Sequence, residues 1–433
     1  MTNTVLRDGT KCRLSPRARE VGRTRVRYRD LERNQSIAFA ALLVAALFYL
    51  FEFVARIEPS LSSSGISKDL ELSNAGFGLF SSVFFWIYAP MQIVVGILLD
   101  RYGVRRMVLP AILVCASGVL ITGLSESVYV AILGRLFTGL GASFAFVGAL
   151  YVVNHLFSPN RFAVLSGSVN ALGMIGTAVG AVLLVQVVDA IGWRTTFIAT
   201  SIVGAALFVL AWLVLPKSPE SDNGGAQAPI LAPVLEVASS RSIWLIAVIG
   251  SLMYVPVNVF GGLWGNAELL ADHHLSKVGA ETAVSMIFWG MALGSVGAGA
   301  LSDRLGHRKW IICLASWAAA PVWLAILLSP TQSIAVLSVL LFVAGALGGA
   351  QMLTFAVAKD GQDAAHVGTV VAFVNMIGIG SALVFQPLVG GLLDATAQDY
   401  SSALSVLPIC LALAGVLAFF ISEGSRRNGH EEE

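Results

Sequence analysis

Long apolar runs separated by short polar segments occupy most of the chain. A helix needs roughly 20 apolar residues to cross a bilayer, and the chain holds about twelve runs of that length. The pattern predicts an all-α membrane protein with twelve transmembrane helices. Their expected positions are residues 37–57, 75–99, 107–124, 128–153, 162–187, 195–215, 243–264, 279–301, 309–328, 334–358, 368–393 and 402–422.

A polar segment near mid-chain divides the predicted helices into two sets of six. Residues 217–242 are rich in Pro, Ser, Gly, Asp and Ala, which is typical of a linker. We therefore expect two similar six-helix bundles joined by this linker, with a polar tail at each end. The predicted divisions are residues 1–36, 37–216, 217–242, 243–422 and 423–433.

The composition agrees with a membrane protein. The 433 residues are 56% hydrophobic and only 12% charged, with a mean hydropathy of +0.79, whereas a soluble domain carries about 25% charged residues. The four cysteines are scattered and show neither disulfide nor zinc spacing. The sequence contains no Walker A motif and no recognisable nucleophile–base pair. We therefore expect no enzymatic activity and no cofactor.

Positive charge is sorted to one side of the predicted membrane. Outside the helices, only Lys68, Arg194 and Lys277 fall in the loops opposite the N-terminal tail. The positive-inside rule therefore predicts that both termini are cytoplasmic. The basic tail of residues 1–36 would lie beside anionic lipid, so the bilayer is its expected partner. A nucleic-acid arm or a docking segment is the alternative interpretation of this tail.

One short motif occurs in both halves of the chain. The pattern G-x-x-x-D-R-x-G-x-R-[RK] covers residues 96–106 after the second predicted helix and residues 299–309 after the eighth. An internal repeat at matched depth is typical of transporters built from two similar halves. The motif resembles the loops that join helices 2 and 3 and helices 8 and 9 in the major facilitator superfamily.

This resemblance implies a conformational latch on the cytoplasmic side. In that family the aspartate of each loop meets the N-terminus of a helix in the opposite half, where backbone amides favour an anion. Asp100 would then meet the helix that starts near Gly368, and Asp303 the helix that starts near Phe162. The expected latch residues are Gly96, Asp100, Arg101, Gly103, Arg105, Arg106, Gly299, Asp303, Arg304, Gly306, Arg308 and Lys309.

Two charged residues lie inside the first predicted helix. A charge at the bilayer centre costs roughly 2.5–3.5 kcal/mol on insertion scales, so these side chains are expected to avoid lipid. Glu52 and Arg56 are four residues apart and share one face, with Tyr49 close to the same face. We expect this face to line a central cavity, where Glu52 would carry a coupled proton. The alternative is a structural ion pair.

A second cation is predicted in the fourth helix. The segment from Gly134 to Gly141 contains R-x-x-x-G-x-G, which resembles the helix-4 motif of the superfamily. The resemblance implies that Arg135 handles protons or substrate. Beside the single carboxylate of Glu52, the two arginines would give the N-terminal half a net charge of about +1, which suits an anionic or zwitterionic solute. Alternatively, Arg135 binds backbone carbonyls.

The second half offers polar rather than charged candidates. We expect no comparable buried charge there, and the best candidates are Asn258, Gln351 and Asn375. Polar side chains among apolar neighbours face a cavity or join helices, and both interpretations remain open for these three.

A polar cluster follows the seventh predicted helix. It consists of Glu268, Asp272, His273 and His274. An exposed loop is the expected structure. Carboxylates and imidazoles also bind metal ions, so a metal site is the weaker alternative.

These features predict a monomeric secondary transporter of the bacterial inner membrane. It would move a small polar or anionic solute, an organic anion or an amino acid, by alternating access coupled to protons. One alternative is an iron or metal-complex transporter of an internal membrane, since the chain is also similar to magnetosome-associated permeases of the superfamily. Another is a receptor of the same fold that binds a solute without moving it.

Overall fold

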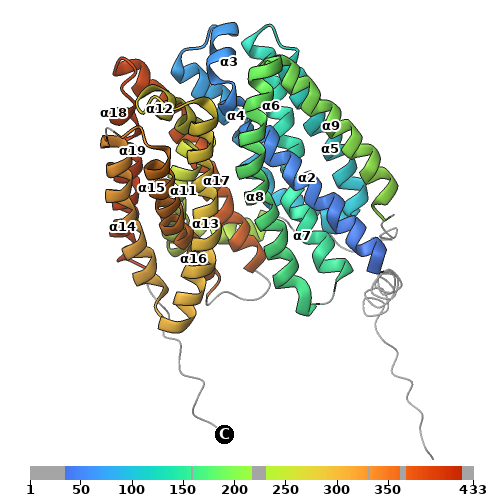
Figure 1. Ribbon diagram of the computed structural model, residues 1–433. Helices are drawn as coiled ribbons and strands as arrows, with labels where there is room; N and C mark the ends of the chain where they lie inside the picture. The colour runs from blue at the N-terminus through green and yellow to red at the C-terminus, as the bar shows by residue number, and fades with distance from the viewer. Residues whose placement is uncertain (1–34, 158, 217–230, 330, 361–366, 422–433) are drawn as a thin grey trace, which may run out of the picture.

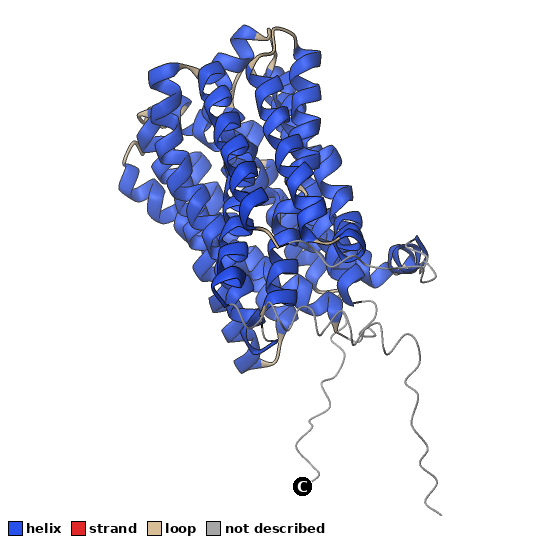
Figure 2. Ribbon diagram, turned by 90° about the vertical axis from the view of Figure 1, so that its right-hand side faces the viewer, coloured by secondary structure: helices blue, strands red, loops and turns tan. Residues whose placement is uncertain are grey.

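The computed structural model describes residues 35–157, 159–216, 231–329, 331–360 and 367–421, and every regular element among them is a helix (Figure 2). Twelve helical segments of this part of the chain are long and apolar enough to cross a membrane. The predicted all-α membrane fold is therefore confirmed. The predicted tails, except Gln35 and Ser36, and most of the predicted linker lie outside the described residues.

The first six spans form one bundle (Figure 1). The helices of this bundle are α2 (Gln35–Leu61), α3 (Ser63–Asp69), α4 (Asn74–Tyr102), α5 (Val104–Gly123), α6 (Val128–Ala142), α7 (Phe144–Leu156), α8 (Pro159–Ile191) and α9 (Trp193–Val214). The short helix α3 lies in the connection between α2 and α4, and α6 and α7 together make one span.

The last six spans form the second bundle. Its elements are α10 (Leu231–Ser239), α11 (Arg241–Pro256), η1 (Val257–Trp264), α12 (Gly265–Ala271), α13 (Lys277–Leu305), α14 (Arg308–Leu328), α15 (Ile334–Gly348), η2 (Gly349–Gln351), α16 (Met352–Lys359), α17 (Val367–Ala395), α18 (Tyr400–Leu404) and α19 (Val406–Ala418). The helix α10 lies within the predicted linker, so this part of the segment is a helix rather than a loop.

The two bundles use the same start and stop signals for their second helix. Ser73 caps α4, where its hydroxyl accepts a hydrogen bond from Gly76, and Ser276 caps α13 through Gly279 in the same way. These helices end at Gly103 and Gly306, whose φ angles of 78° and 72° are left-handed. Glycine adopts this conformation without steric penalty. The repeated glycine of the loop motif is thus explained by the helix end.

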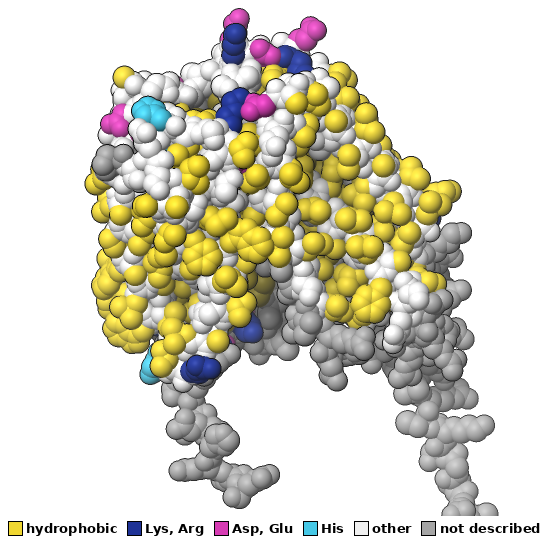
Figure 3. All heavy atoms as spheres, viewed as in Figure 1, with side chains coloured by type: hydrophobic (Ala, Val, Ile, Leu, Met, Phe, Trp, Pro, Cys, Tyr) yellow, Lys and Arg dark blue, Asp and Glu magenta, His cyan; other side chains and the backbone are white. Residues whose placement is uncertain are grey.

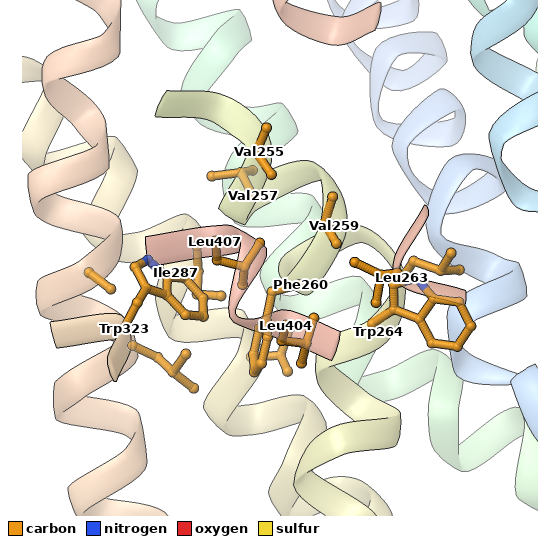
Figure 4. Close-up of a cluster of buried hydrophobic side chains, with 14 of the residues drawn as sticks. Val255, Val257, Val259, Phe260, Leu263, Trp264, Ile287, Trp323, Leu404 and Leu407 are labelled. Atoms are coloured by element: carbon orange, nitrogen blue, oxygen red, sulfur yellow. The ribbon is translucent and has the colours of Figure 1, made fainter. Parts of the chain in front are cut away.

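Four of the twelve predicted helices are interrupted. The breaks lie at Ser143, at the π-helix η1, at the 3₁₀ turn η2 and at Ser405. The longest break is η1, where Phe260 packs edge-on against Trp323 of α14 at a ring separation of 4.9 Å. Figure 4 shows this cluster, in which Phe260 and Leu263 of η1 lie near residues of α18 and α19. A π segment widens the helix locally and often marks a functional site.

The bundles meet along two pairs of helices, α4 with α17 and α8 with α13. We call the face that holds residues 62–73, 124–127, 272–276 and 396–399 the distal face; it is the upper side of Figure 1. On this face Asp394 of α17 accepts hydrogen bonds from the backbone amides of Asn74 and Ala75, at 3.0 and 2.9 Å. Lys277 and Asp189 form an ion pair between α13 and α8.

Glycine permits the close approach of the two bundles. A Cβ atom on Gly390 of α17 would lie 2.2 Å from the carbonyl oxygen of Asn74, and one on Gly78 would lie 2.6 Å from the carbonyl oxygen of Gln386. Both distances are far below van der Waals contact, so neither position accommodates a side chain in this conformation. The backbones of α4 and α17 therefore touch directly at the distal end.

The outer surface matches a protein embedded in lipid. In the view of Figure 3, hydrophobic side chains cover the middle of the molecule, and charged side chains gather near its two ends. Exposed large apolar residues such as Leu183, Leu293 and Val339 belong to this surface. A soluble monomer does not expose apolar patches of this size.

Candidate functional site

Helix α2 presents a buried ion pair to the interior. Glu52 is fully buried, and the Nε of Arg56 donates to its Oε1 at 2.8 Å. The guanidinium carbon of Arg56 lies 4.6 Å from the ring centre of Phe53 and 4.9 Å from that of Tyr88. The aromatic faces stabilise the cation where water is excluded. The predicted partnership of Glu52 and Arg56 is present.

Helix α6 places Arg135 beside the same region. The G-x-G part of its motif allows this, because a Cβ on Gly139 would lie 2.2 Å from the carbonyl oxygen of Phe84 in α4. Arg135 is 1% exposed, and its two Nη atoms donate to the carbonyls of Ala55 and Ser81, at 2.9 and 3.3 Å. The alternative interpretation, that Arg135 binds backbone carbonyls, describes these contacts.

A second carboxylate shares this region. Glu58 is fully buried, and the hydroxyl of Thr200 on α9 donates to its Oε1 at 2.9 Å. The predicted helix ended at residue 57, whereas α2 continues to Leu61 and carries Glu58 inside the bundle. The expectation of one carboxylate and a net charge of +1 was therefore wrong in its count. With all four groups ionised, two glutamates balance two arginines.

The second bundle contributes amides. The Nδ2 of Asn258 in η1 donates to Ser381 Oγ of α17 at 2.8 Å, and Gln386 Nε2 of α17 donates back to the Asn258 carbonyl at 2.9 Å. These bonds tie the π segment to α17. Gln351 is buried in η2, and Asn375 is half-buried on α17.

The expectation of no buried charge in the second half was also wrong. Glu281 on α13 is 4% exposed, and Asn266 Nδ2 of α12 donates a hydrogen bond to it at 2.7 Å. Glu281 stood inside the predicted eighth helix, so its burial was detectable from the sequence by the argument used for Glu52.

A cavity lies between the two bundles and is lined by residues of both. Its volume is about 20 Å³, which is room for one water molecule in this conformation. Arg56, Arg135, Ser81 and Thr177 line it from the first bundle, whereas the second bundle contributes Tyr254, Asn258 and Gln386. Among the predicted site residues, Arg56, Arg135 and Asn258 line the cavity. Glu52 does not line the cavity but is bonded to Arg56, which does. Tyr49, Gln351 and Asn375 do not line it either.

The polar cluster after the seventh span is not an exposed loop. Glu268 and His273 are buried, with His273 Nε2 at 3.2 Å from Glu268 Oε1, whereas Asp272 and His274 are exposed. The other ring nitrogen of His273 lies 2.7 Å from the carbonyl oxygen of Thr331. The neighbouring carboxyl group of Glu268 raises the pKa of His273 above its usual value. No group of three or more metal-binding side chains occurs within the described residues.

The sequence matches the model of one protein family in both halves. That model is the major facilitator superfamily, and it matches residues 37–265 and 247–433. The chain belongs to the major facilitator superfamily. The predicted family resemblance is therefore confirmed, and membership makes the protein a membrane transporter by family.

Relatives in the superfamily are similar over most of the chain. A probable sulfoacetate transporter of Cupriavidus necator is 24% identical and covers 65% of this chain and 69% of its own. An efflux pump of Mycolicibacterium smegmatis is 26% identical, with 92% and 95% covered. A probable nitrate/nitrite transporter of Mycobacterium tuberculosis is 29% identical, with 80% and 87% covered.

Solved structures of the superfamily share the fold. A bacterial homologue of the human lysosomal transporter Spinster, in an inward-facing and occupied conformation, superimposes with a TM-score of 0.70. The two chains are 17% identical, and the match covers 88% of this chain and 96% of the other.

The basic residues of the superfamily's repeated loop tie helices together within each bundle. Arg105 donates to the carbonyls of Trp212 and Leu215 at the end of α9. In the second bundle, Lys309 donates to the carbonyl of Phe419 beyond α19 at 2.6 Å, and Arg308 binds Ala356 at 3.1 Å. Cations suit the C-terminal ends of helices. These hydrogen bonds hold neighbouring helix ends together within each bundle, on the face opposite the distal face.

The structure describes the side-chain exposure of most of the other predicted latch residues, but not that of the two aspartates. The side chains of Arg101, Arg106 and Arg304 are exposed, while Gly96 and Gly299 are half-buried. The side chains of Asp100 and Asp303 lie outside the described residues, so the predicted contact with the opposite bundle stays a prediction.

Proposed function

We propose that this protein is a secondary active transporter of small anions that works by alternating access. The observation that carries the proposal is the cavity between the bundles, which both Arg56 and Arg135 line. Alternating access requires a site that both bundles share, and this cavity has walls from both. Tyr254, Asn258 and Gln386 supply hydrogen-bonding groups from the opposite wall.

The chemistry of the two arginines favours an acidic cargo. A guanidinium binds a carboxylate or a sulfonate through paired hydrogen bonds, and such a bond is strong where water is excluded. Sulfoacetate and nitrate, the solutes in the names of two relatives, are both anions. A small anion is therefore the preferred substrate class.

Proton coupling follows from the shared use of Arg56. In this conformation Glu52 holds Arg56. An anion that draws Arg56 away would leave Glu52 buried without its counter-ion, and a buried carboxylate without a partner binds a proton. Anion and proton would then bind together, as a symporter requires. We place the protein, as a monomer, in the bacterial inner membrane with both termini in the cytoplasm.

The experiment that tests this function has two stages. Purified protein is first screened by thermal shift against sulfoacetate, nitrate, hexuronates and amino acids, because a bound ligand raises stability by mass action. Uptake of the strongest ligand is then measured in proteoliposomes with an imposed proton gradient. We expect binding by organic anions, loss of binding in Arg135→Ala, and uphill uptake.

Three results would contradict parts of the proposal. Binding without uptake would make the protein a solute receptor. Uptake that ignores the proton gradient would remove proton coupling while keeping the anion transporter. A shift with iron complexes alone would favour the metal alternative.

A further inference from the structure

The first bundle has unused hydrogen-bond donors in the wall of the cavity. Arg135 and Ser81 are buried side chains that line the cavity. The Nε–H of Arg135 and the hydroxyl of Ser81 are buried and have no hydrogen-bond partner. The hydroxyl of Thr177 is different, because it donates to the carbonyl of Gly173 at 2.8 Å. This wall therefore offers N–H and O–H groups to a hydrogen-bond acceptor.

The facing wall contains an amide whose oxygen is unused. Gln386 of α17 is buried and lines the cavity from the second bundle. Its Nε2 donates to the backbone carbonyl of Asn258 at 2.9 Å. A carbonyl oxygen only accepts, so this contact identifies the amino end of the Gln386 amide. The other end, Oε1, is buried and has no hydrogen-bond partner.

A second amide of this wall has the same orientation. Asn258 Nδ2 donates to Ser381 Oγ at 2.8 Å and to the carbonyl of Ile379 at 3.3 Å. Ser381 gives its own proton to the carbonyl of Gly378, so its oxygen accepts from Asn258. None of these bonds uses Oδ1 of Asn258. Both amides thus spend their N–H groups inside the second bundle and leave their oxygens over.

Gln386 is held in place where the bundles meet. Its backbone carbonyl accepts a hydrogen bond from the indole of Trp264 at 3.1 Å. The same carbonyl lies against α4, where a Cβ on Gly78 would be 2.6 Å away. Gly78 is one helical turn before Ser81. An acceptor that is fixed in this way needs little reorganisation to bind a ligand.

We propose that Gln386 is a specificity-determining residue that selects anions carrying a hydroxyl group. This inference rests on the proposed anion transport, in which the bundles separate on one face and the cavity widens. The charged end of the cargo binds Arg56, Arg135 and Ser81, and its hydroxyl group donates to Gln386 Oε1. The substrate class is thereby narrowed to small hydroxy-substituted carboxylates and sulfonates.

Other small anions leave part of this site unsatisfied. Nitrate and ionised sulfoacetate, the solutes in the names of two relatives, contain acceptors only. With either of them Gln386 Oε1 stays buried without a donor, which weakens binding. An amino acid brings an ammonium group, but no acidic residue lines the cavity within the described part of the chain, so this charge has no counter-ion there. A neutral hydroxyl group matches both walls.

Size-matched anions test the inference on the full-length wild-type protein. Calorimetric titration compares glycolate with acetate and fluoroacetate, and isethionate with ethanesulfonate. Fluorine replaces the hydroxyl group at nearly the same size but cannot donate. The hydroxyl-bearing anion of each set should bind about tenfold more tightly or better, because its competitors leave a buried acceptor unsatisfied. Glycolate should also bind more tightly than glycine.

One substitution assigns this preference to Gln386. Gln386→Leu has a similar volume but no acceptor, so the preference for a hydroxyl group should fall to about threefold or less. The affinity for acetate should change little. Gln351→Leu is the matched control, since Gln351 is a buried glutamine of the same bundle that does not line the cavity, and it should keep the wild-type preference. A preference that persists in Gln386→Leu would overturn the assignment.

The wild-type titrations distinguish failure of this inference from failure of the proposed function. Equal affinities for glycolate, acetate and fluoroacetate would keep the anion site but overturn selection by Gln386. Binding of nitrate or sulfoacetate alone, or tighter binding of glycine than of glycolate, would overturn it too. If no anion binds, the proposed function fails and this inference fails with it. These comparisons need no variant, so they decide the matter even if Gln386→Leu does not fold.

Discussion

At the scale of single residues, Arg135 makes two kinds of contact. It donates hydrogen bonds to carbonyls of α2 and α4, and it also lines the cavity. If the cavity binds an anion as proposed, these two roles would compete, because an anion that draws on the guanidinium would weaken its hold on the backbone. Arg135 would then link the position of α2 and α4 to the occupancy of the site.

Two replacements of Arg135 should distinguish its contribution to stability from its contribution to anion binding. Arg135→Ala leaves three carbonyls without their donor and should destabilise the protein by about 3 kcal/mol. Arg135→Lys keeps the charge but loses the planar fork, so it should fold better than the alanine variant and bind anions more weakly than the wild type. Thermal melting and ligand titration measure the two effects. A lysine variant with wild-type affinity would show that the site needs only charge.

The proposed coupling role of Glu52 can be tested by replacing its carboxyl group with an amide. Glu52→Gln removes the acid that would bind the proton but keeps a group that Arg56 contacts. We expect exchange of anion across proteoliposomes to continue at a similar rate, while accumulation against a gradient is lost. Uphill uptake equal to that of the wild type would show that Glu52 is not required for coupling.

The buried pair of His273 and Glu268 makes stability depend on pH. The pKa of His273 is raised, chiefly by its contact with the carboxyl group of Glu268. The stabilisation is therefore fully present below the usual histidine pKa of about 6.5 and is lost as the pH rises through the raised value. Thermal melting across this range should show a fall for the wild type that is absent in His273→Asn. The exposed neighbour gives the control, since His274→Ala should keep the wild-type profile.

Sequence reasoning found the charged residues that share a face of one helix, but not the partners that come from other helices. Glu52 and Arg56 were detectable because their spacing is local. Glu58 was missed because the apolar pattern weakens before the helix ends, and helix ends are set by contacts that a pattern does not show. The link from Asn266 to Glu281 joins two helices and leaves no periodic trace.

At the scale of helices, the spans were predictable and their interruptions were not. Length and hydropathy identify a span, and all twelve predicted spans correspond to described helices. The π-helix η1 arises from packing, since its Phe260 and Trp264 are buried against other helices. Pro256 and the adjacent Gly261 and Gly262 weaken ordinary helical winding here, but they do not by themselves specify a π segment.

The close contact of α6 with α4 gives a prediction for helix packing. Gly139→Ala would place a methyl group 2.2 Å from the Phe84 carbonyl oxygen, so we expect a destabilisation of about 1–3 kcal/mol. Gly297→Ala on α13 is the matched control, because no atom lies within 4 Å of its added Cβ. It should be neutral or slightly stabilising, as alanine favours a helix. Equal melting temperatures for the two variants would contradict this packing.

At the scale of the whole molecule, contacts on the distal face hold the two bundles together. Asp394 accepts three hydrogen bonds from the first turn of α4. It therefore stabilises the conformation in which the bundles meet there, and a conformation that opens this face must break these bonds. The predicted aspartate latch of the opposite face would act in the reverse sense.

Loss of Asp394 should shift the equilibrium between conformations. Asp394→Ala removes bonds worth about 1–3 kcal/mol together, which is at least a fivefold change in population. Spin labels at the exposed Glu126 and Ala271 would report a longer distance between the bundles on the distal face. Asp399→Ala is the control, since Asp399 bonds only within its own segment, to Ser402. An unchanged distance in Asp394→Ala would argue against this latch.

The π segment also fixes how this protein tolerates changes in length. Each residue turns an α-helix by roughly 100°, so removal of one residue from 257–264 that restored ordinary winding would rotate everything after it by that angle. Asn266 would then turn from Glu281, and Glu268 from His273. A one-residue deletion here is therefore a more drastic change than most substitutions. Homologous chains that align with a gap in this segment should lack both of these buried pairs.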